Sequence, residues 1–513
     1  MFSKVYSGGL LGIEGYVVQV EADVSAGLPG FHMVGCLASE VREAEERVRT
    51  ATRNSGFRLS AMKVTVNLSP ANLRKAGTGC DLPVAVAILA AYSIVKPSQL
   101  SGSAFLGELG LDGKIKPVRG VLSMVLAMRD AGLDRCFLPE ENVREGLAVE
   151  GIQIVKVSSL KELIGLLNMP VRIHAERPSV TSAESGTYYP VDFSEVNGQT
   201  AVKRATEVAV AGQHNILYIG PPGSGKSMIA RRIPSIMPKL SREEQMEISR
   251  IYSVCGMLGP DQVLLQKRPF RAPHHTISAQ ALTGGGREPR PGEISLASRG
   301  VLFLDELPEF QKRTLELLRQ PLEDKRITVS RLRGSCDFPA HFMLAAAMNP
   351  CPCGYYPDRE RCSCTKWQVQ QYLGRISRPL LDRIDISVEA SPVRYQDISR
   401  DGCNETSESV RNRIEQARQL QSRRFSGTAF FFNSQMDGRA LRQYCRLRTE
   451  DESFLQEIFG RLGLSARGYH KLLRVARTIA DLAGEEEIRR EHLCEAVGYR
   501  EPEEMYWGRG GRN

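Results

Sequence analysis

A glycine-rich segment in the middle of the chain has the residue types and spacing that bind phosphate groups. The segment reads GPPGSGKS and fits the pattern G-x-x-x-x-G-K-[ST]. Its members are Gly220, Pro221, Pro222, Gly223, Ser224, Gly225, Lys226 and Ser227. The glycines let backbone N–H groups turn toward phosphate oxygens, the lysine adds a positive charge, and the serine hydroxyl is a ligand for Mg²⁺. The pattern predicts a site for ATP and its magnesium ion.

Two acidic residues farther along the chain have the chemistry of nucleotide hydrolysis. Asp305 and Glu306 directly follow the apolar run VLFL, which is typical of a buried strand. We expect Asp305 to hold Mg²⁺ through a water molecule and Glu306 to polarise the water that attacks the γ-phosphate. An acidic pair after a strand is weak evidence for nucleotide hydrolysis on its own. It is strong evidence when, as here, it follows a phosphate loop in the same chain.

Three further polar residues fit the same reaction. Asn349 follows an expected strand at residues 343–348, where it would orient the attacking water. Arg378 and Arg383 flank a short apolar helix, from which an arginine reaches the nucleotide of a neighbouring subunit and stabilises the charge of the transition state. The alternative for each arginine is an ordinary surface position or an ion pair.

The elements around these residues are those that a phosphate loop needs. Residues 215–219 read NILYI, a short buried strand, and a helix-forming segment follows Ser227. Strands and helices alternate from residue 191 to residue 393, as a parallel sheet requires. This context argues against a chance glycine-rich turn.

The rest of the chain divides by composition. Residues 1–169 mix strand-like and helical segments and predict an α+β or α/β domain, whereas residues 170–190 are rich in Pro, Ser, Thr and Gly and read as a linker. Residues 394–500 are helical in pattern, and we expect a flexible tail at 501–513. Within the first domain we expect strands at 16–20 and 63–67 and helices at 39–52 and 81–92.

Four of the twelve cysteines crowd into one short segment with the pattern C-x-C, eight residues, C-x-C. They are Cys351, Cys353, Cys362 and Cys364. Four thiolates on one loop bind Zn²⁺ tetrahedrally and brace a segment that lacks hydrophobic mass. The pairs are closer than in the commoner C-x₂-C sites, so four reduced surface cysteines remain the alternative.

Composition sets limits without choosing a partner. The net charge of +9 over 513 residues permits an anionic partner such as nucleic acid, but a mildly basic enzyme has the same balance. The longest apolar run, residues 82–95, is too short to cross a bilayer, and no secretory signal is evident. We expect a cytoplasmic protein with no membrane partner.

The central motifs resemble the magnesium-chelatase-like AAA+ ATPases, specifically the YifB/ComM competence-protein family. The resemblance is carried by PFRAPHHTISAQALTGGGREPRPGEISLASRGVLFLDELPEF, followed by LRQPLEDKRITVSR, AAAMNPCPCG and RPLLDRIDI, and it covers essentially the whole chain. It implies an α/β fold with an AAA+ P-loop core and a C-terminal helical lid. It also implies a homo-hexameric ring in which each nucleotide lies at a subunit boundary.

The resemblance assigns roles residue by residue. The GPPGSGKS loop matches Walker A, Asp305 and Glu306 match Walker B, and Asn349 matches sensor 1. Arg383 in LLDRID matches the arginine finger, with Arg378 as a second finger candidate, and Arg467 in SARGYHKLLRVAR matches the sensor 2 arginine.

The N-terminal segment resembles the Lon-protease-like α+β domain of this family, a ribosomal S5 domain 2-like fold, through GELGLDGKIKPVRG at residues 107–120. Lon proteases need a serine and a lysine as a catalytic dyad. Here the serine position falls near Gly79 and the lysine position near Leu122 or Met124. Because none of these side chains is a nucleophile or base, we expect a non-proteolytic domain.

Two basic loops are expected to face the channel of the ring. Residues 269–294 and 326–338 match insertions of this AAA+ clade, and the second reads as a hairpin around Gly334. The candidate DNA contacts are Arg271, Arg287, Arg290, Arg331 and Arg333. Such loops track a phosphate backbone without reading its sequence, although solvated basic loops are an equal alternative for any one arginine. His274 and His275 have no acid nearby in the sequence, and we assign them no metal.

These features favour an ATP-driven hexameric motor on single-stranded, duplex or branched DNA. The resemblance implies a helicase that promotes branch migration in homologous recombination and natural transformation. A protein-remodelling AAA+ ATPase, either a chaperone or a chelatase-type motor subunit, remains the alternative. The Lon-like domain does not fit the chelatase arrangement, in which a separate partner inserts the metal.

Overall fold

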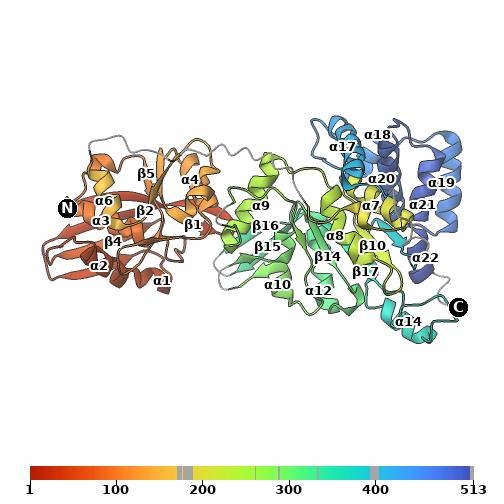
Figure 1. Cartoon of the computed structure of the whole chain (residues 1–513), viewed down its shortest axis with the longest axis horizontal. Helices are drawn as coiled ribbons and strands as arrows, with labels where there is room; N and C mark the ends of the chain where they lie inside the picture. The colour runs from red at the N-terminus through yellow and green to blue at the C-terminus, as the bar shows by residue number, and fades with distance from the viewer. Residues whose placement is uncertain are drawn as a thin grey trace.

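The computed structural model describes residues 1–169, 176, 189–259, 262–286, 289–331, 334–392 and 404–508, without the side chains of residues 331 and 334. Figure 1 shows an elongated molecule with an N-terminal domain at one end, an α/β core in the middle and a helical region beside the core. The first strand lies toward one end of the molecule, and the last described helix, at residues 501–507, lies toward the other (Figure 1).

The N-terminal domain is built on a mixed seven-stranded sheet with the order β3-β4-β2-β1-β5-β8-β9. Its longest strands, β1 and β2, form an antiparallel pair in which every residue of β1 has a partner on β2, from Phe2↔Asp23 to Leu11↔Glu14. The expected strands at 16–20 and 63–67 are confirmed within β2 and β4. The strands are β1 (Phe2–Leu11), β2 (Glu14–Ser25), β3 (Gly30–Val34), β4 (Lys63–Ser69), β5 (Ser103–Phe105), β8 (Arg135–Pro139) and β9 (Gln153–Val157).

Helices cover this sheet. Every residue of α3 (Asp81–Ala91) is buried, as its continuous apolar sequence predicts. The single helix expected at 39–52 is instead two helices, α1 (Ser39–Arg42) and α2 (Ala44–Asn54), separated at Glu43. The other helices of the domain are α4 (Val121–Asp130), α5 (Val143–Leu147) and α6 (Leu160–Asn168), and a small hairpin is formed by β6 (Glu108–Leu109) and β7 (Ile115–Lys116).

The core contains a parallel five-stranded sheet with the order β11-β14-β17-β10-β18. Its strands are β11 (Phe270–Arg271), β14 (Val301–Leu304), β17 (Met343–Met348), β10 (Ile216–Ile219) and β18 (Ile386–Glu389). The three middle strands are buried at every residue, which explains why they read as continuous apolar runs. The parallel direction brings the carboxyl ends of these strands to one edge, where α/β proteins bind ligands.

Helices and short elements surround the core sheet. The helices are α7 (Thr200–Gly212), α8 (Lys226–Ile236), α9 (Arg242–Cys255), α10 (Ala279–Thr283), α11 (Glu293–Leu296), α12 (Lys312–Glu316), α13 (Arg319–Asp324), α14 (Lys366–Leu373) and α15 (Arg378–Leu381). A two-residue ladder joins β12 (Gly284–Gly285) to β13 (Arg290–Pro291). The predicted hairpin is confirmed as β15 (Arg326–Arg331) and β16 (Gly334–Pro339).

The helical region packs around α20 (Ala466–Leu482), whose buried face shares one hydrophobic cluster with the core sheet. The helical pattern that the sequence shows in this region corresponds to α17 (Ser407–Arg424), α18 (Gly438–Tyr444), α19 (Thr449–Arg461), α20 and α21 (Arg490–Gly498). The prediction of a flexible tail is wrong for residues 501–507, which form α22 (Glu501–Trp507). Its aromatic residues are anchored, because Tyr506 donates to Glu389 and Trp507 donates to the carbonyl of Leu373.

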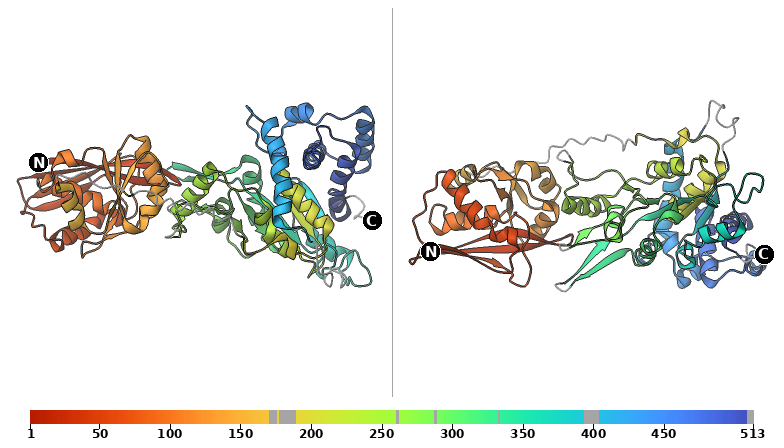
Figure 2. Two further views of the ribbon diagram at one scale, coloured as in Figure 1. Left: turned by 45° about the horizontal axis from the view of Figure 1, so that its top comes forward. Right: turned by 90° about the horizontal axis from the view of Figure 1, so that it is seen from below.

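The N-terminal domain docks on the core through α9. Arg250 donates to Glu14 at 2.6 Å, Ser253 donates to the buried carboxylate of Glu145, and the Gly120 amide donates to the carbonyl of Ser253. Figure 2 shows the β1–β2 pair reaching toward the core. A Cβ atom at Gly12, in the turn between β1 and β2, would lie 3.2 Å from Cβ of Cys336 on β16. The turn of the N-terminal sheet therefore touches the predicted DNA-binding hairpin.

Within the described residues, no helix has both the length and the apolar character to span a bilayer. The expected linker lies outside the described residues except for residues 176, 189 and 190.

Candidate functional site

The phosphate loop joins β10 to α8, as the sequence predicts. Gly223 and Gly225 have φ angles of 75° and 84°, in the left-handed region that favours glycine. A Cβ atom at Gly220 would lie 2.3 Å from the carbonyl oxygen of Ala390, so only glycine fits there. Because α8 begins at Lys226, the loop presents the free N–H groups of a helix N-terminus.

Lys226 is buried at the centre of this loop. Its Nζ atom donates to the carbonyl oxygens of Gly220 and Pro221, each at 2.8 Å, and lies 3.3 Å from Oδ1 of Asn349. Burial lowers the pKa of Lys226 to about 8, and the nearby Asp305 opposes that shift. A phosphate group would add the negative charge that a buried ammonium group needs.

Ser227 and Asp305 meet across the loop. The Ser227 hydroxyl donates to Oδ2 of Asp305 at 2.6 Å, while Oδ1 of Asp305 accepts from the backbone N–H of Glu306 at 3.0 Å. Hydroxyl and carboxylate oxygens are the hard donors that Mg²⁺ prefers. The residues fit the ion that the sequence predicts, for which Ser227 would be a ligand and Asp305 would hold a bound water molecule.

Glu306 stands at the end of β14 with an exposed side chain and a φ angle of 51°. Its Oε2 atom lies 3.5 Å from Nδ1 of His275, whose ring packs against the rings of His274 and Phe310. The sequence places no acid near His275, so this contact was missed. It arises only because β11 and β14 are neighbours in the sheet, which brings the segment after β11 to the end of β14.

The phosphate loop, the acidic pair and Asn349 therefore converge at one edge of the core sheet. Asn349 directly follows β17, and β17 lies between β14 and β10. The order of the strands places Lys226 beside Asn349, with Asp305 and Glu306 directly after the next strand, β14.

The two arginines matched to the finger and to sensor 2 meet on one carboxylate. Arg383 and Arg467 lie 2.8 Å and 3.0 Å from the same oxygen, Oε1 of Glu323. Arg383 also donates to the carbonyl oxygens of Arg319 and Pro379, and its side chain is only 10% exposed. Arg378 is exposed, and its side chain has no hydrogen bond or ion pair to any described residue. The role of each arginine toward a neighbouring subunit stays a prediction.

The candidate DNA contacts differ in exposure and in how much of each residue the structure describes. Arg271 forms a two-pronged ion pair with Glu293 at 2.6 and 2.7 Å, so its charge is already matched. Arg290 on β13 is exposed and lines a cavity of about 290 Å³ with Gly284 and Gly285. Arg331 ends β15, where only its backbone is described, and Arg287 and Arg333 lie outside the described residues.

The four predicted zinc ligands come together. The sulfur atoms of Cys351, Cys353, Cys362 and Cys364 all lie within 4.8 Å of one another, and all four cysteines are free thiols.

The positions matched to a protease dyad hold no catalytic groups. Gly79 precedes α3, and the side chains of Leu122 and Met124 are buried in α4. The adjacent Cys80 is also buried, and burial raises the pKa of its thiol to about 12. A neutral buried thiol is a poor nucleophile, so Cys80 is a poor replacement for the missing serine.

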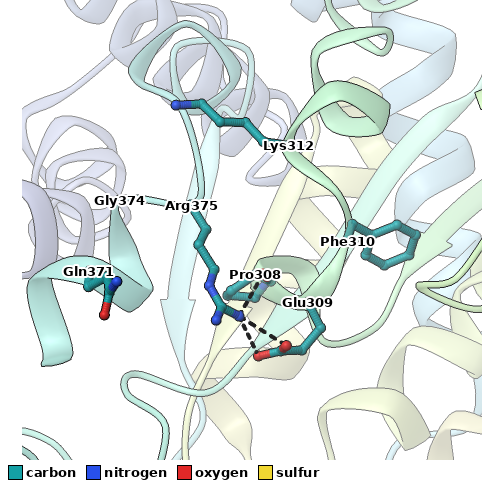
Figure 3. Close-up of a pocket in the computed structure, with 7 residues that line it drawn as sticks. All are labelled: Pro308, Glu309, Phe310, Lys312, Gln371, Gly374 and Arg375. Atoms are coloured by element: carbon teal, nitrogen blue, oxygen red, sulfur yellow. Dashed lines mark hydrogen bonds and ion pairs between the residues drawn. The ribbon is translucent and has the colours of Figure 1, made fainter.

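A separate cavity of about 350 Å³ is lined by residues that follow the acidic pair in the chain (Figure 3). Figure 3 shows Arg375 reaching Glu309, with both carboxylate oxygens 3.0 Å from Nη1 of the arginine. The cavity is lined by Pro308, Glu309, Phe310, Lys312, Gln371, Gly374 and Arg375. It contains no residue of the phosphate loop and is distinct from the nucleotide site.

Three family models match the chain. "Magnesium chelatase, subunit ChlI" matches residues 192–398, "Subunit ChlI of Mg-chelatase" matches residues 20–142, and "Magnesium chelatase, subunit ChlI C-terminal" matches residues 404–500. The first of these models spans the phosphate loop, the acidic pair and Asn349.

Known proteins resemble the chain over nearly its full length. Competence protein ComM of Haemophilus influenzae is 39% identical over 504 residues, and uncharacterized protein YifB of Escherichia coli is 41% identical over 500 residues; each match covers 97% of both chains. Lon protease 2 of Bacillus subtilis is 27% identical over 176 residues, which is 32% of this chain and 31% of that protein, so the likeness to Lon is partial. The family models, the parallel sheet with its phosphate loop and the full-length relatives together place this chain in the magnesium-chelatase-like AAA+ proteins of the ComM/YifB family.

Proposed function

We propose that the protein hydrolyses ATP and uses the energy to move DNA. The observation that supports the ATPase most directly is the convergence of Lys226, Ser227, Asp305 and Asn349 at one edge of the sheet. AAA+ family membership points to the same reaction.

Each residue has a defined task in this proposal. The loop N–H groups and Lys226 hold the β- and γ-phosphates, and Ser227 and Asp305 hold the magnesium ion, which neutralises charge on the phosphates when it is bound. Glu306 accepts a proton from the attacking water, and Asn349 fixes the position of that water. These groups bind substrate and stabilise charge, as phosphoryl transfer requires.

The active form in this proposal is a homo-hexamer. Each nucleotide then lies at a subunit boundary, where Arg383 or Arg378 of the neighbouring copy stabilises the transition state. Because Arg383 is held by Glu323 in the single chain, its use in trans requires that ion pair to open.

DNA is the substrate that the basic loops favour. Arg290 is exposed on the short β12–β13 ladder, and the β15–β16 hairpin begins and ends its first strand with Arg326 and Arg331. Backbone phosphates are bound by such positive charges irrespective of sequence. With ComM as a full-length relative, we propose a helicase that drives branch migration during recombination or transformation in the cytoplasm. The four-cysteine cluster holds a structural Zn²⁺ ion in this proposal.

The test compares ATPase rates with and without single-stranded, duplex and branched DNA across a series of salt concentrations. We expect DNA to stimulate the ATPase, and we expect the stimulation to weaken as the salt concentration rises. DNA binding by Arg290→Ala should depend less on salt, because each lost phosphate contact lowers the slope of log binding constant against log salt concentration by about one. ATPase activity without DNA stimulation or DNA binding would overturn the motor and favour a protein-remodelling ATPase. Lys226→Ala should abolish nucleotide binding, and Glu306→Gln should bind ATP without turnover.

A further inference from the structure

The segment between β17 and α14 carries the four clustered cysteines in two pairs. Cys351 and Cys353 follow the end of β17, while Cys362 and Cys364 precede the first residue of α14. The helix start is fixed separately by a capping box in which Thr365 and Gln368 exchange hydrogen bonds. A group that binds all four sulfurs would therefore tie the end of a central strand to the start of a helix.

The distances between the sulfur atoms match those around one metal ion. Sγ of Cys351 lies 3.3 Å from Cys353 and 3.7 Å from Cys362, and the Cys353–Cys362 separation is 3.5 Å. Four thiolates, each about 2.3 Å from a central Zn²⁺, stand about 3.8 Å apart in a tetrahedron. Disulfide sulfurs are far closer, at about 2.05 Å. A cluster of several iron atoms would hold its ligands farther apart.

The backbone supports thiolates at this place. The N–H groups of Gly354 and Tyr356 point to Sγ of Cys351, at 3.2 and 3.4 Å. Such donors outside the ligand shell orient and stabilise a metal-bound sulfur. Gly354 reaches its position with a φ angle of 89°, which glycine adopts without strain.

This segment and the last residue of β17 contact the phosphate loop at three points. A Cβ atom at Gly354 would lie only 2.4 Å from Cδ of Pro222, so the Gly354 backbone packs directly against the Pro222 ring, where a side chain at position 354 would clash. The N–H group of Gly220 donates to the carbonyl of Met348 at 3.2 Å. Asn349, two residues before Cys351, lies 3.3 Å from Nζ of Lys226.

We propose that the four cysteines bind one Zn²⁺ ion and that this ion is energetically coupled to the nucleotide on the phosphate loop. Bound zinc fixes the segment that carries Asn349 and Gly354, and the segment in turn fixes the loop at Lys226 and Pro222. The coupling acts equally in both directions, since linkage requires zinc and nucleotide to strengthen each other by the same factor. The inference rests on the proposed nucleotide binding, but not on any action on DNA.

The first experiment measures metal content and nucleotide affinity in the full chain. The protein as purified should contain one zinc ion per chain, measured by mass spectrometry of its metals. Cys362→Ser should lose the zinc and bind a non-hydrolysable ATP analogue at least fivefold more weakly. This factor is near the lower end of typical couplings between two sites, which are about 5- to 150-fold. Cys494→Ser, at an exposed position on α21, is the matched control and should keep both. Zinc well below one ion per chain, or iron in its place, would overturn the metal assignment.

The second experiment leaves all four cysteines intact. Zinc transfer from the wild-type chain to a coloured chelator is timed with and without the ATP analogue. We expect the analogue to slow the transfer at least fivefold, and to have no effect on Lys226→Ala. If the analogue binds but zinc leaves at the same rate, the coupling is wrong while the proposed ATPase stands. If no nucleotide binds to the zinc-loaded wild type, the proposed ATPase itself is wrong.

Discussion

His275 contacts the proposed general base, because its Nδ1 atom lies 3.5 Å from Oε2 of Glu306. The two residues belong to different segments. His275 follows β11 in a loop that also carries candidate DNA contacts, whereas Glu306 ends β14. The contact joins the loop that would sense DNA to the carboxylate that would activate water.

His275→Ala should lower kcat for ATP while leaving the KM nearly unchanged, because Glu306 loses a restraint and the phosphate loop does not. DNA stimulation should fall as well. The matched control is His274→Ala, since His274 bonds to Thr276 rather than to an acid. Steady-state kinetics with and without DNA give the measurement. Equal kcat values for His275→Ala and the wild type would show that the contact plays no part in turnover.

Arg383 and Arg378 can be separated by mixing subunits. If Arg383 acts in trans, Arg383→Ala should lower kcat by about 10³-fold, as the loss of an arginine finger does. Mixing Arg383→Ala subunits with Lys226→Ala subunits should restore activity, because some boundaries then combine an intact finger with an intact phosphate loop. Full activity of Arg383→Ala, together with loss of activity in Arg378→Ala, would transfer the role to the exposed Arg378.

Nucleotide affinity should depend on the protonation of Lys226. Burial lowers the pKa of this lysine to about 8, so its charge is lost as the pH rises through that value. Phosphate favours the charged form, hence ATP binding takes up a proton and the Kd should rise by roughly tenfold per pH unit well above 8. Fluorescence titration between pH 7 and 9.5 measures this, with Lys226→Arg as a control that should show a flat profile. A Kd for the wild type that stays constant to pH 9.5 would contradict the assignment.

The last described helix should contribute to stability. Trp507 is 8% exposed and donates to the carbonyl of Leu373 at 3.1 Å, whereas Trp367 is 67% exposed. Trp507→Ala should lower the unfolding free energy of the core by about 3–5 kcal/mol, the usual cost of removing a buried tryptophan. Trp367→Ala should change it by no more than about 0.5 kcal/mol. Urea unfolding followed by circular dichroism compares the two, and similar midpoints would show that α22 is not anchored.

The local parts of the nucleotide site follow from the sequence. The apolar run NILYI directly before GPPGSGKS predicts a buried strand that leads into a phosphate loop. In the same way, VLFLDE predicts a buried strand that ends in two acidic residues. The four cysteines are also so close in sequence that their clustering can be predicted without knowing the fold.

Contacts between distant segments could not be found in this way. His275 contacts Glu306 because two strands are neighbours in the sheet. Glu323 forms ion pairs with both Arg383 and Arg467, but the spacing of these three residues in the sequence matches no motif that predicts the contact. The helix at Glu501–Trp507 was missed for a related reason. Its acidic, Pro-containing sequence reads as a tail until Leu373 and Glu389 provide partners for its aromatic residues.

The central claim is that ATP hydrolysis moves DNA strands. Its most direct test is strand exchange in a three-stranded branched DNA, followed on a gel with the wild type and with Glu306→Gln. The wild type should displace the strand with ATP but not with a non-hydrolysable analogue, and Glu306→Gln should bind the DNA without displacing the strand. A wild-type protein that hydrolyses ATP in the presence of this DNA and leaves every strand in place would contradict it.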